Sequence, residues 1–237
     1  MKKLRSDFKK LFIDWGKYYA IPAHWRAGQW ILFVGFLSAV VVSAYFDEPM
    51  RYLFFTIHGP MLDAVFKFAH WFGTGYPTLC IFLGLYIGGL ALNSEKTRSG
   101  GLMVLQSYLY SGAITISLKS IIGRWRPAAG HGHLTFSPWT TTPNAHLSFP
   151  SGDVAVVFSL SIVMAGLFQP GDDASQQKKN AILLWQGSWI LLAVLTSLSR
   201  IYYDAHWFSD VVFSTVNAGV AGVWVVKKYR IETGIVR

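Results

Sequence analysis

Six long apolar stretches, separated by polar segments, follow one another along this chain of 237 residues. They cover residues 30–46, 76–92, 102–118, 154–168, 181–197 and 211–226. Each is somewhat shorter than the roughly 20 residues that a helix needs to cross the hydrocarbon layer of a membrane, so flanking aromatic and small residues must complete each span. The pattern predicts an all-α protein, a single domain over residues 1–237 built as a bundle of six transmembrane helices.

Two amphipathic segments lie outside these stretches. Residues 4–19 carry apolar side chains at helical spacing among lysines, which is typical of a helix in the membrane interface, although a short helix packed on the bundle has the same pattern. Residues 54–72 are too polar to cross a membrane, and their ionisable side chains are His58, Asp63, Lys67 and His70. We expect an interfacial helix there, which with the polar loop at 123–152 roofs the outer, periplasmic side of the bundle or merely caps it.

Composition and charge agree with a membrane protein. The chain is 52% hydrophobic and 14% charged, whereas an average soluble domain is about 25% charged. With six spans, both termini share one side with the loops at 93–101 and 169–180, and this side carries fifteen of the 21 Lys and Arg. The positive-inside rule explains the net charge of +9 without a nucleic-acid partner. It predicts a bacterial inner-membrane protein with both termini in the cytoplasm.

The remaining six cations fall on the opposite side, and they are Arg51, Lys67, Lys119, Arg124, Arg126 and Arg200. Charged groups at the ends of membrane spans are costly unless they are paired or used, so those that cluster without matching acids indicate an anionic ligand. Lys119 and Arg126 are two helical turns apart, and both project from one face if the helix continues to about Trp125 before Pro127 ends it. Arg124 is either a further phosphate contact or a side chain that extends to the interface, and the second interpretation is favoured.

Two further motifs complete the candidate site. The turn Pro150-Ser151-Gly152-Asp153 opens the fourth apolar stretch, where its backbone amides and the helix N-terminus suit an anion. Later in the chain, Ser199-Arg200 is followed by His206 and Asp210. His206 and Asp210 share one face if a helix begins near Trp207, so that Asp210 holds one imidazole nitrogen and leaves the other free as a nucleophile or base.

These motifs, in this order, resemble the signature of the type 2 phosphatidic acid phosphatase (PAP2) superfamily, which is K-x6-RP, PSGH and SR-x5-H-x3-D. The resemblance covers residues 119–210, and the six-span layout extends it to most of the chain. It implies an enzyme that needs no metal and no cofactor, in which His206 attacks phosphorus to give a phosphohistidine and Asp210 orients His206. The groups that hold the phosphate oxygens are then Lys119, Arg126, Ser151, Gly152 and Arg200.

One position departs from the signature, because Asp153 stands where the superfamily has the histidine that protonates the leaving group. A free aspartate has a pKa of about 3.9, against about 6.5 for histidine, and is a poor acid at neutral pH unless its pKa rises. Three alternatives stay open: Asp153 is a catalytic acid, a neighbour such as His146 replaces it, or the leaving group needs little protonation. The third favours a diphosphate substrate, whose leaving phosphate departs as an anion.

The sequence therefore predicts a hydrolase, a membrane lipid phosphatase whose site faces the periplasm. Its substrate is a lipid phosphate or diphosphate: polyprenyl diphosphate, lipid A phosphate or phosphatidylglycerol phosphate. The alternatives are a lipid phosphotransferase that uses the same phosphohistidine, and a non-catalytic lipid-phosphate binder that results from Asp153. His131 and His133 have a spacing that suits a metal, but no third ligand is evident, so we predict a solvated loop and no metal site. The pattern does not determine the oligomeric state.

Overall fold

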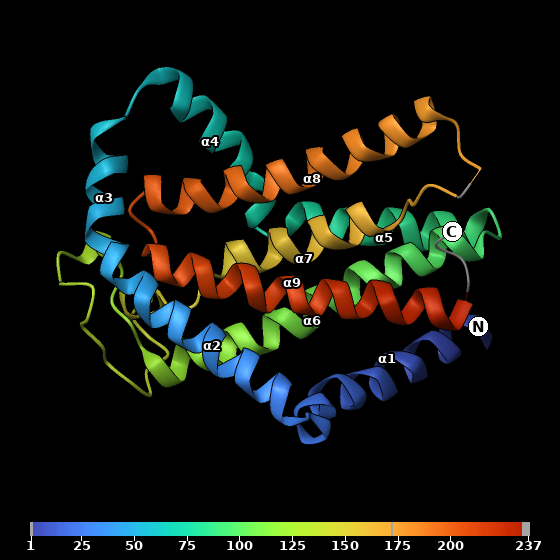
Figure 1. Cartoon of the computed structure of the whole chain (residues 1–237), viewed down its shortest axis with the longest axis horizontal. Helices are drawn as coiled ribbons and strands as arrows, with labels where there is room; N and C mark the ends of the chain where they lie inside the picture. Colours follow the sequence, from blue (N-terminus) through green and yellow to red (C-terminus); the bar gives the residue numbers. More distant parts are fainter. Residues whose placement is uncertain (1, 172, 234–237) are drawn as a thin grey trace.

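The computed structural model describes residues 2–171 and 173–233, and it contains helices and no β-strand within those ranges. The helices are α1 (Lys2–Ala20), α2 (Ala27–Ser43), α3 (Asp47–Thr56), α4 (Pro60–Gly73), α5 (Tyr76–Ala91), α6 (Glu95–Ile122), α7 (Gly152–Gly166), α8 (Gln176–Tyr202) and α9 (Phe208–Thr233) (Figure 1). Short 3-10 turns occupy residues 21–24, 44–46, 127–129 and 144–146. The all-α prediction is confirmed.

The number of membrane spans differs from the expected six. Four segments are long and apolar enough to cross a membrane: Ala27–Thr56, α6, α8 and Phe208–Glu232. The pair α4 and α5, which is bent by 54°, adds a fifth candidate. The remaining apolar stretch forms α7, whose 15 residues extend only about 22 Å at 1.5 Å per residue, short of the roughly 30 Å hydrocarbon layer. The structure thus supports four or five spans, and the sixth stays a prediction.

α7 lies in the centre of the bundle. It packs against α6, α8 and α9 (Figure 1). Most of its side chains are buried, including Val154, Val157, Leu160 and Val163. A helix that is apolar on all sides is stable only when other helices or lipid surround it. α2 is the opposite case, because only 6% of the apolar window at Ala27–Thr56 is buried inside the protein. The sequence pattern is similar for both helices, but their neighbours differ.

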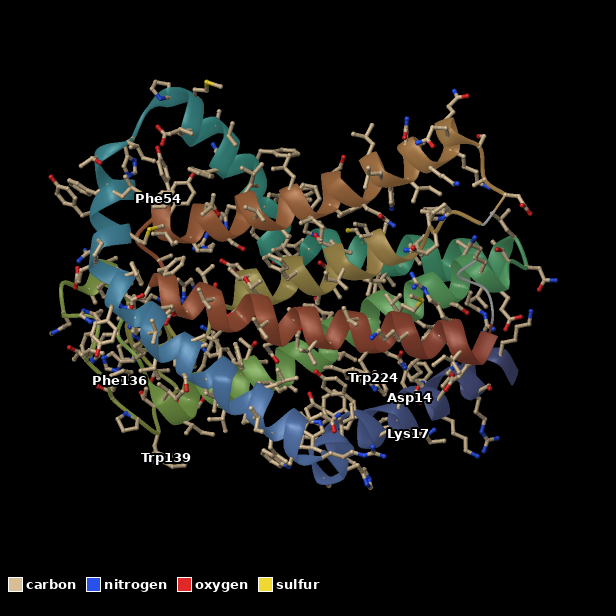
Figure 2. All side chains as sticks on the ribbon, in the orientation of Figure 1. Asp14, Lys17, Phe54, Phe136, Trp139 and Trp224 are labelled. Atoms are coloured by element: carbon tan, nitrogen blue, oxygen red, sulfur yellow. The ribbon has the colours of Figure 1, made fainter. Side chains whose placement is uncertain are left out.

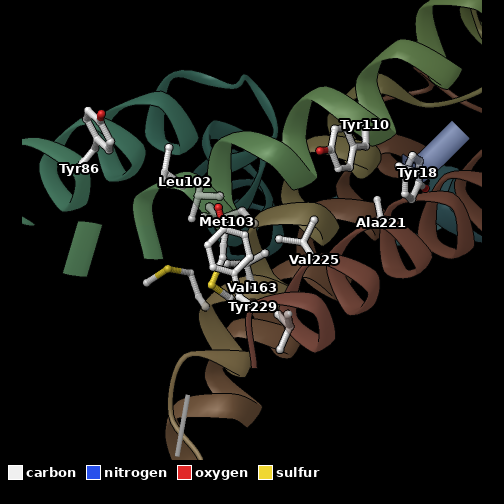
Figure 3. Close-up of a cluster of buried hydrophobic side chains, with 13 residues drawn as sticks. Tyr18, Tyr86, Leu102, Met103, Tyr110, Val163, Ala221, Val225 and Tyr229 are labelled. Carbon is white, nitrogen blue, oxygen red and sulfur yellow. The ribbon is translucent and has the colours of Figure 1, made fainter. Parts of the chain in front are cut away.

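α1 follows α6 rather than lying apart from the bundle. Asp7 pairs with Arg98, 2.6 Å away, and the Tyr19 hydroxyl donates to the Tyr110 carbonyl 2.7 Å away. Asp14 lies between these contacts and pairs with Lys228 of α9 (Figure 2). Tyr18 stacks on Tyr110 in the buried cluster that also holds Val225 and Tyr229 (Figure 3). α1 therefore packs on the bundle along one side, while Phe8 and Phe12 on its other side are 54% and 78% exposed, and its position in the membrane interface stays a prediction.

Different segments of the chain lie at the two ends of the bundle. The start of α1 and the end of α9 lie at one end, whereas α3 and the loop between α6 and α7 lie at the other (Figure 1). Phe136 and Trp139 of this loop appear at the same end as Phe54 of α3 (Figure 2). The short connection between α8 and α9 also lies there, so all three sequence motifs meet at the end of the bundle that is away from the start of α1.

Candidate active site

The first motif is positioned by a loop and not by a helix face, so the expectation of a helix to Trp125 is wrong. α6 ends at Ile122, because Gly123 adopts a φ of +58° and its N–H donates to the Lys119 carbonyl. A side chain is excluded at this glycine, since a Cβ would lie 1.8 Å from the Ser137 carbonyl oxygen. Arg126 is instead brought to the site by its guanidinium, which donates to the carbonyls of Asn144 and Ala205.

The second motif opens α7 as expected. Ser151 is the N-cap residue, and Gly152 is the first residue of the helix. The Ser151 hydroxyl is buried and finds no hydrogen-bond partner among the described residues. Lys119 lies against this turn: its Nζ donates to the Leu147 carbonyl 2.6 Å away, and its Cε is 3.8 Å from where a Cβ on Gly152 would sit. The turn therefore presents a free hydroxyl beside a cation, which suits a phosphate oxygen.

The third motif places an imidazole between a carboxylate and a guanidinium. His206 lies in the connection between α8 and α9, and its Nδ1 is 3.6 Å from Asp210 Oδ2. Its Nε2 is 3.5 Å from Arg126 Nη1. Burial lowers the pKa of His206 to about 4; Asp210 opposes this shift, and Lys119 and Arg126 add to it. At neutral pH the imidazole is therefore unprotonated, the form that a nucleophile needs.

Arg124 does not extend to the interface as expected, because it is buried between two carboxylates. Its guanidinium lies 2.6 Å from Asp210 Oδ1 and 2.6 Å from Asp47 Oδ2. Asp210 also accepts from the Trp207 N–H, 2.9 Å away, and from the Ser148 hydroxyl. These donors fix the carboxylate that faces His206. Sequence reasoning missed Asp47 and Ser148, although an acid directly after an apolar stretch is itself a signal of a buried partner.

Asp153, the departure from the signature, is engaged in a second cluster. Arg200 Nε lies 2.9 Å from Asp153 Oδ2, and Arg200 Nη1 donates to Nδ1 of His70, whose Nδ1 is 3.8 Å from the same carboxylate oxygen. α4 comes this close because residue 73 is glycine: a Cβ on Gly73 would lie 2.7 Å from the Asp153 Cβ. Sequence reasoning noted His70 only as one of several polar residues in its segment.

The two clusters form one site. The Arg200 carbonyl accepts from the backbone N–H groups of Ala205 and His206, at 3.0 and 3.2 Å. The pKa of Arg126 is lowered by burial and by the positive charge of Arg200, and Asp153 and Asp210 oppose this shift. The charges of both clusters therefore act on the same guanidinium.

The other polar residues near the motifs have structural contacts. The rings of His131 and His146 both lie 3.9 Å from the Trp125 ring, and His133 Nδ1 is 3.5 Å from Glu48. Within residues 2–171 and 173–233, no group of three side chains is arranged to hold a metal ion. The predicted absence of a metal stays a prediction. Ser199 of the third motif donates to the Thr196 carbonyl of its own helix, away from the other motif residues.

Several apolar helices and this arrangement of cations around a histidine define a class, the helical integral-membrane proteins with a cationic site beside a buried histidine. The chain belongs to the PAP2 superfamily, whose family model matches residues 100–233, more than half of its length. At the level of the family, this confirms the prediction of a phosphatase, a hydrolase of phosphate esters. No curated protein sequence matches the chain.

Two crystal structures share the fold. LpxE of Aquifex aeolicus is 23% identical, with a TM-score of 0.52, over 76% of this chain and 94% of that one. The PAP2-type phosphatidylglycerolphosphate phosphatase of Bacillus subtilis is 20% identical, with a TM-score of 0.62, over 84% of this chain and 96% of that one. At identities this low, the two structures establish a common fold. The substrate of this chain has to be inferred from its own residues.

Proposed function

We propose that this protein is a membrane lipid phosphatase that works through a phosphohistidine and needs no metal. The observation that carries the proposal is the position of His206, whose Nδ1 faces Asp210 while Nε2 faces the guanidinium of Arg126. Because three donors hold Asp210 in place, His206 has one nitrogen directed to a carboxylate and the other directed to the cations. This is the arrangement that an attacking histidine requires.

In the proposed reaction, Nε2 of His206 attacks phosphorus, and the bond from phosphorus to the lipid oxygen breaks with its electron pair on that oxygen. Water then attacks the phosphohistidine and returns the electron pair to Nε2. Lys119, Arg126 and Arg200 neutralise the charge on the phosphoryl oxygens, while the unpartnered Ser151 hydroxyl and the Gly152 amide donate to them. Asp210 stabilises the positive charge on the ring.

The substrate class follows from the setting of the site at the end of a membrane bundle. A lipid phosphate or diphosphate can reach it with its tail in the bilayer. The candidates are polyprenyl diphosphate, lipid A phosphate and phosphatidylglycerol phosphate, and the Bacillus subtilis neighbour, named for the last of these, supports its inclusion. We propose a bacterial inner-membrane protein with six spans, cytoplasmic termini and a site on the periplasmic side, partly roofed by α4 and the 123–151 loop.

The decisive test measures inorganic phosphate released in detergent, with a chelator present, from phosphatidate and the three candidate lipids. We expect release from at least one lipid, and loss of at least about 10³-fold in His206→Ala because no other group supplies the nucleophile. His58→Gln is the matched control, since His58 is a half-exposed histidine that packs on Tyr202. Release that depends on added divalent metal, or that survives His206→Ala, contradicts the mechanism. Transfer of phosphate to a lipid acceptor in place of release identifies a phosphotransferase.

A further inference from the structure

A second histidine lies beside the residue that departs from the superfamily signature. His70 is in the last turn of α4, and its Nδ1 is 3.8 Å from Asp153 Oδ2. Gly73, one helical turn away, allows α4 to approach the start of α7 this closely. The chain therefore has an imidazole next to position 153, contributed by a different helix.

The contacts of His70 determine which ring nitrogen is available. Arg200 Nη1 is a donor, so Nδ1 of His70 accepts and the ring proton resides on Nε2. The side chain of His70 is 36% exposed, so the imidazole can exchange protons with water. His206, by comparison, is buried, with a side chain that is 3% exposed.

We propose that His70 is a further catalytic residue, which protonates the leaving oxygen and then takes a proton from the attacking water, with Asp153 as its orienting carboxylate. The inference rests on the proposed phosphatase function. When a phosphate draws Arg200 away, Asp153 becomes the partner of Nδ1, and the ring can carry a proton on both nitrogens. Asp153 then acts as the counterpart of Asp210 and is not itself the acid.

The two proton transfers balance the reaction. In the first step, the bond from His206 Nε2 to phosphorus forms, the bond to the lipid oxygen breaks, and that oxygen takes the proton from His70 Nε2. In the second step, His70 Nε2 removes a proton from water as the water oxygen bonds to phosphorus, and the electron pair of the P–N bond returns to His206. His70 takes its second proton from water when the phosphate displaces Arg200, and it ends the cycle with a proton on both nitrogens again.

The test compares two leaving groups in His70→Gln. Phosphatidate must expel an alkoxide, so its hydrolysis should fall about 10²-fold or more without a general acid. With p-nitrophenyl phosphate, whose leaving group departs readily as an anion, formation of the phosphohistidine should stay close to the wild-type rate. Its hydrolysis needs the base, however, so a burst of p-nitrophenol and an accumulated, alkali-stable phosphoenzyme should appear.

Restoring a histidine at position 153 should compensate for the loss. In the double variant His70→Gln with Asp153→His, we expect phosphatidate hydrolysis to recover by at least about tenfold and the burst to disappear. His58→Gln should match wild type on both substrates. An equal loss of phosphohistidine formation from both substrates, or no loss on phosphatidate, would overturn the role of His70. An inactive wild type, or an active His206→Ala, would instead overturn the proposed function itself.

Discussion

Two histidine–aspartate pairs lie in this site, and they differ in how the fold supports them. His206 and Asp210 are four residues apart in one segment, are 3% and 0% exposed, and are backed by Arg124. His70 and Asp153 come from α4 and α7, are 36% and 29% exposed, and share only Arg200. The nitrogen-to-oxygen distances are similar, at 3.6 and 3.8 Å.

The difference shows what each pair can do. A buried pair holds one charge state firmly, because desolvation and fixed donors penalise any change. A half-exposed pair can gain and lose protons to water during a reaction cycle. The buried pair therefore suits a nucleophile, and the exposed pair suits a group that carries protons.

The largest difference between the pairs should appear when the support of the buried pair is removed. Arg124→Ala leaves Asp47 and Asp210 buried without their cation, so we expect the free energy of unfolding to fall by about 3–5 kcal/mol and activity to be lost. Denaturant titration in detergent measures the first effect. Arg51→Ala is the control, since its pair with Asp204 is about one third exposed and should contribute less than about 1 kcal/mol. Equal effects from both variants would contradict the asymmetry.

The pH profile tests the charge state of the buried pair. Burial lowers the pKa of His206 from 6.5 to about 4, so the neutral nucleophile persists as the pH falls, and the acid limb of kcat/KM should lie near pH 4. The profile must be corrected for the ionisation of the substrate phosphate, near pH 6. Lys119→Met removes a nearby cation and should move the limb to higher pH, because the protonated ring is then less disfavoured. An acid limb near pH 6.5 in the wild type would contradict the lowered pKa of His206.

A substitution in α4 should disturb the exposed pair alone. In Gly73→Ala, the new methyl would lie 2.7 Å from the Asp153 Cβ and 3.1 Å from the Thr196 Cγ2. Overpacking of this kind costs about 1–3 kcal/mol and should move His70 away from Asp153. Phosphatidate hydrolysis should fall, while phosphohistidine formation from p-nitrophenyl phosphate persists. Gly84→Ala is the control, because nothing lies within 4 Å of its Cβ position.

The smallest effect should be on stability in Asp153→Asn. The Asp153 carboxylate is 29% exposed, and asparagine keeps an oxygen that can accept from Arg200, whose side chain is 9% exposed, so the free energy of unfolding should fall by only about 1 kcal/mol. Thermal unfolding in detergent, beside Arg124→Ala, measures this. A loss as large as in Arg124→Ala would show that the second pair is structural.

The local parts of this molecule could be predicted from the sequence. The spacing of His206 and Asp210 is four residues, and Asp210 lies in the first turn of α9, so this pair was accessible without the structure. The apolar stretches identified the helices, but not the number of spans. α7 and α2 are equally apolar, and hydropathy does not distinguish a helix surrounded by protein from one surrounded by lipid.

The partners from distant segments could not be predicted. Arg124 meets Asp47 across 77 residues, and Arg200 meets His70 across 130. The position of Arg126 in the site was predicted, but the reason was wrong. Carbonyl groups of loop residues hold its guanidinium, and it does not project from the face of α6. In α1, the amphipathic pattern fits both interpretations. Asp7 and Asp14, both buried, are the feature that indicates packing on the bundle, and the exposed Phe8 and Phe12 keep the interfacial prediction.

The ion pair between Arg200 and Asp153 has a consequence for the end of the catalytic cycle. A phosphate ion left in a pocket of three unpaired cations is a tightly held inhibitor. Of the three cationic side chains that are proposed to hold the phosphate, Arg200 lies 2.9 Å from the Asp153 carboxylate. It can return to that ion pair when the phosphate leaves. In the proposed function Asp153 therefore competes with the product for Arg200, and we expect such an enzyme to release inorganic phosphate quickly and to tolerate it at high concentration.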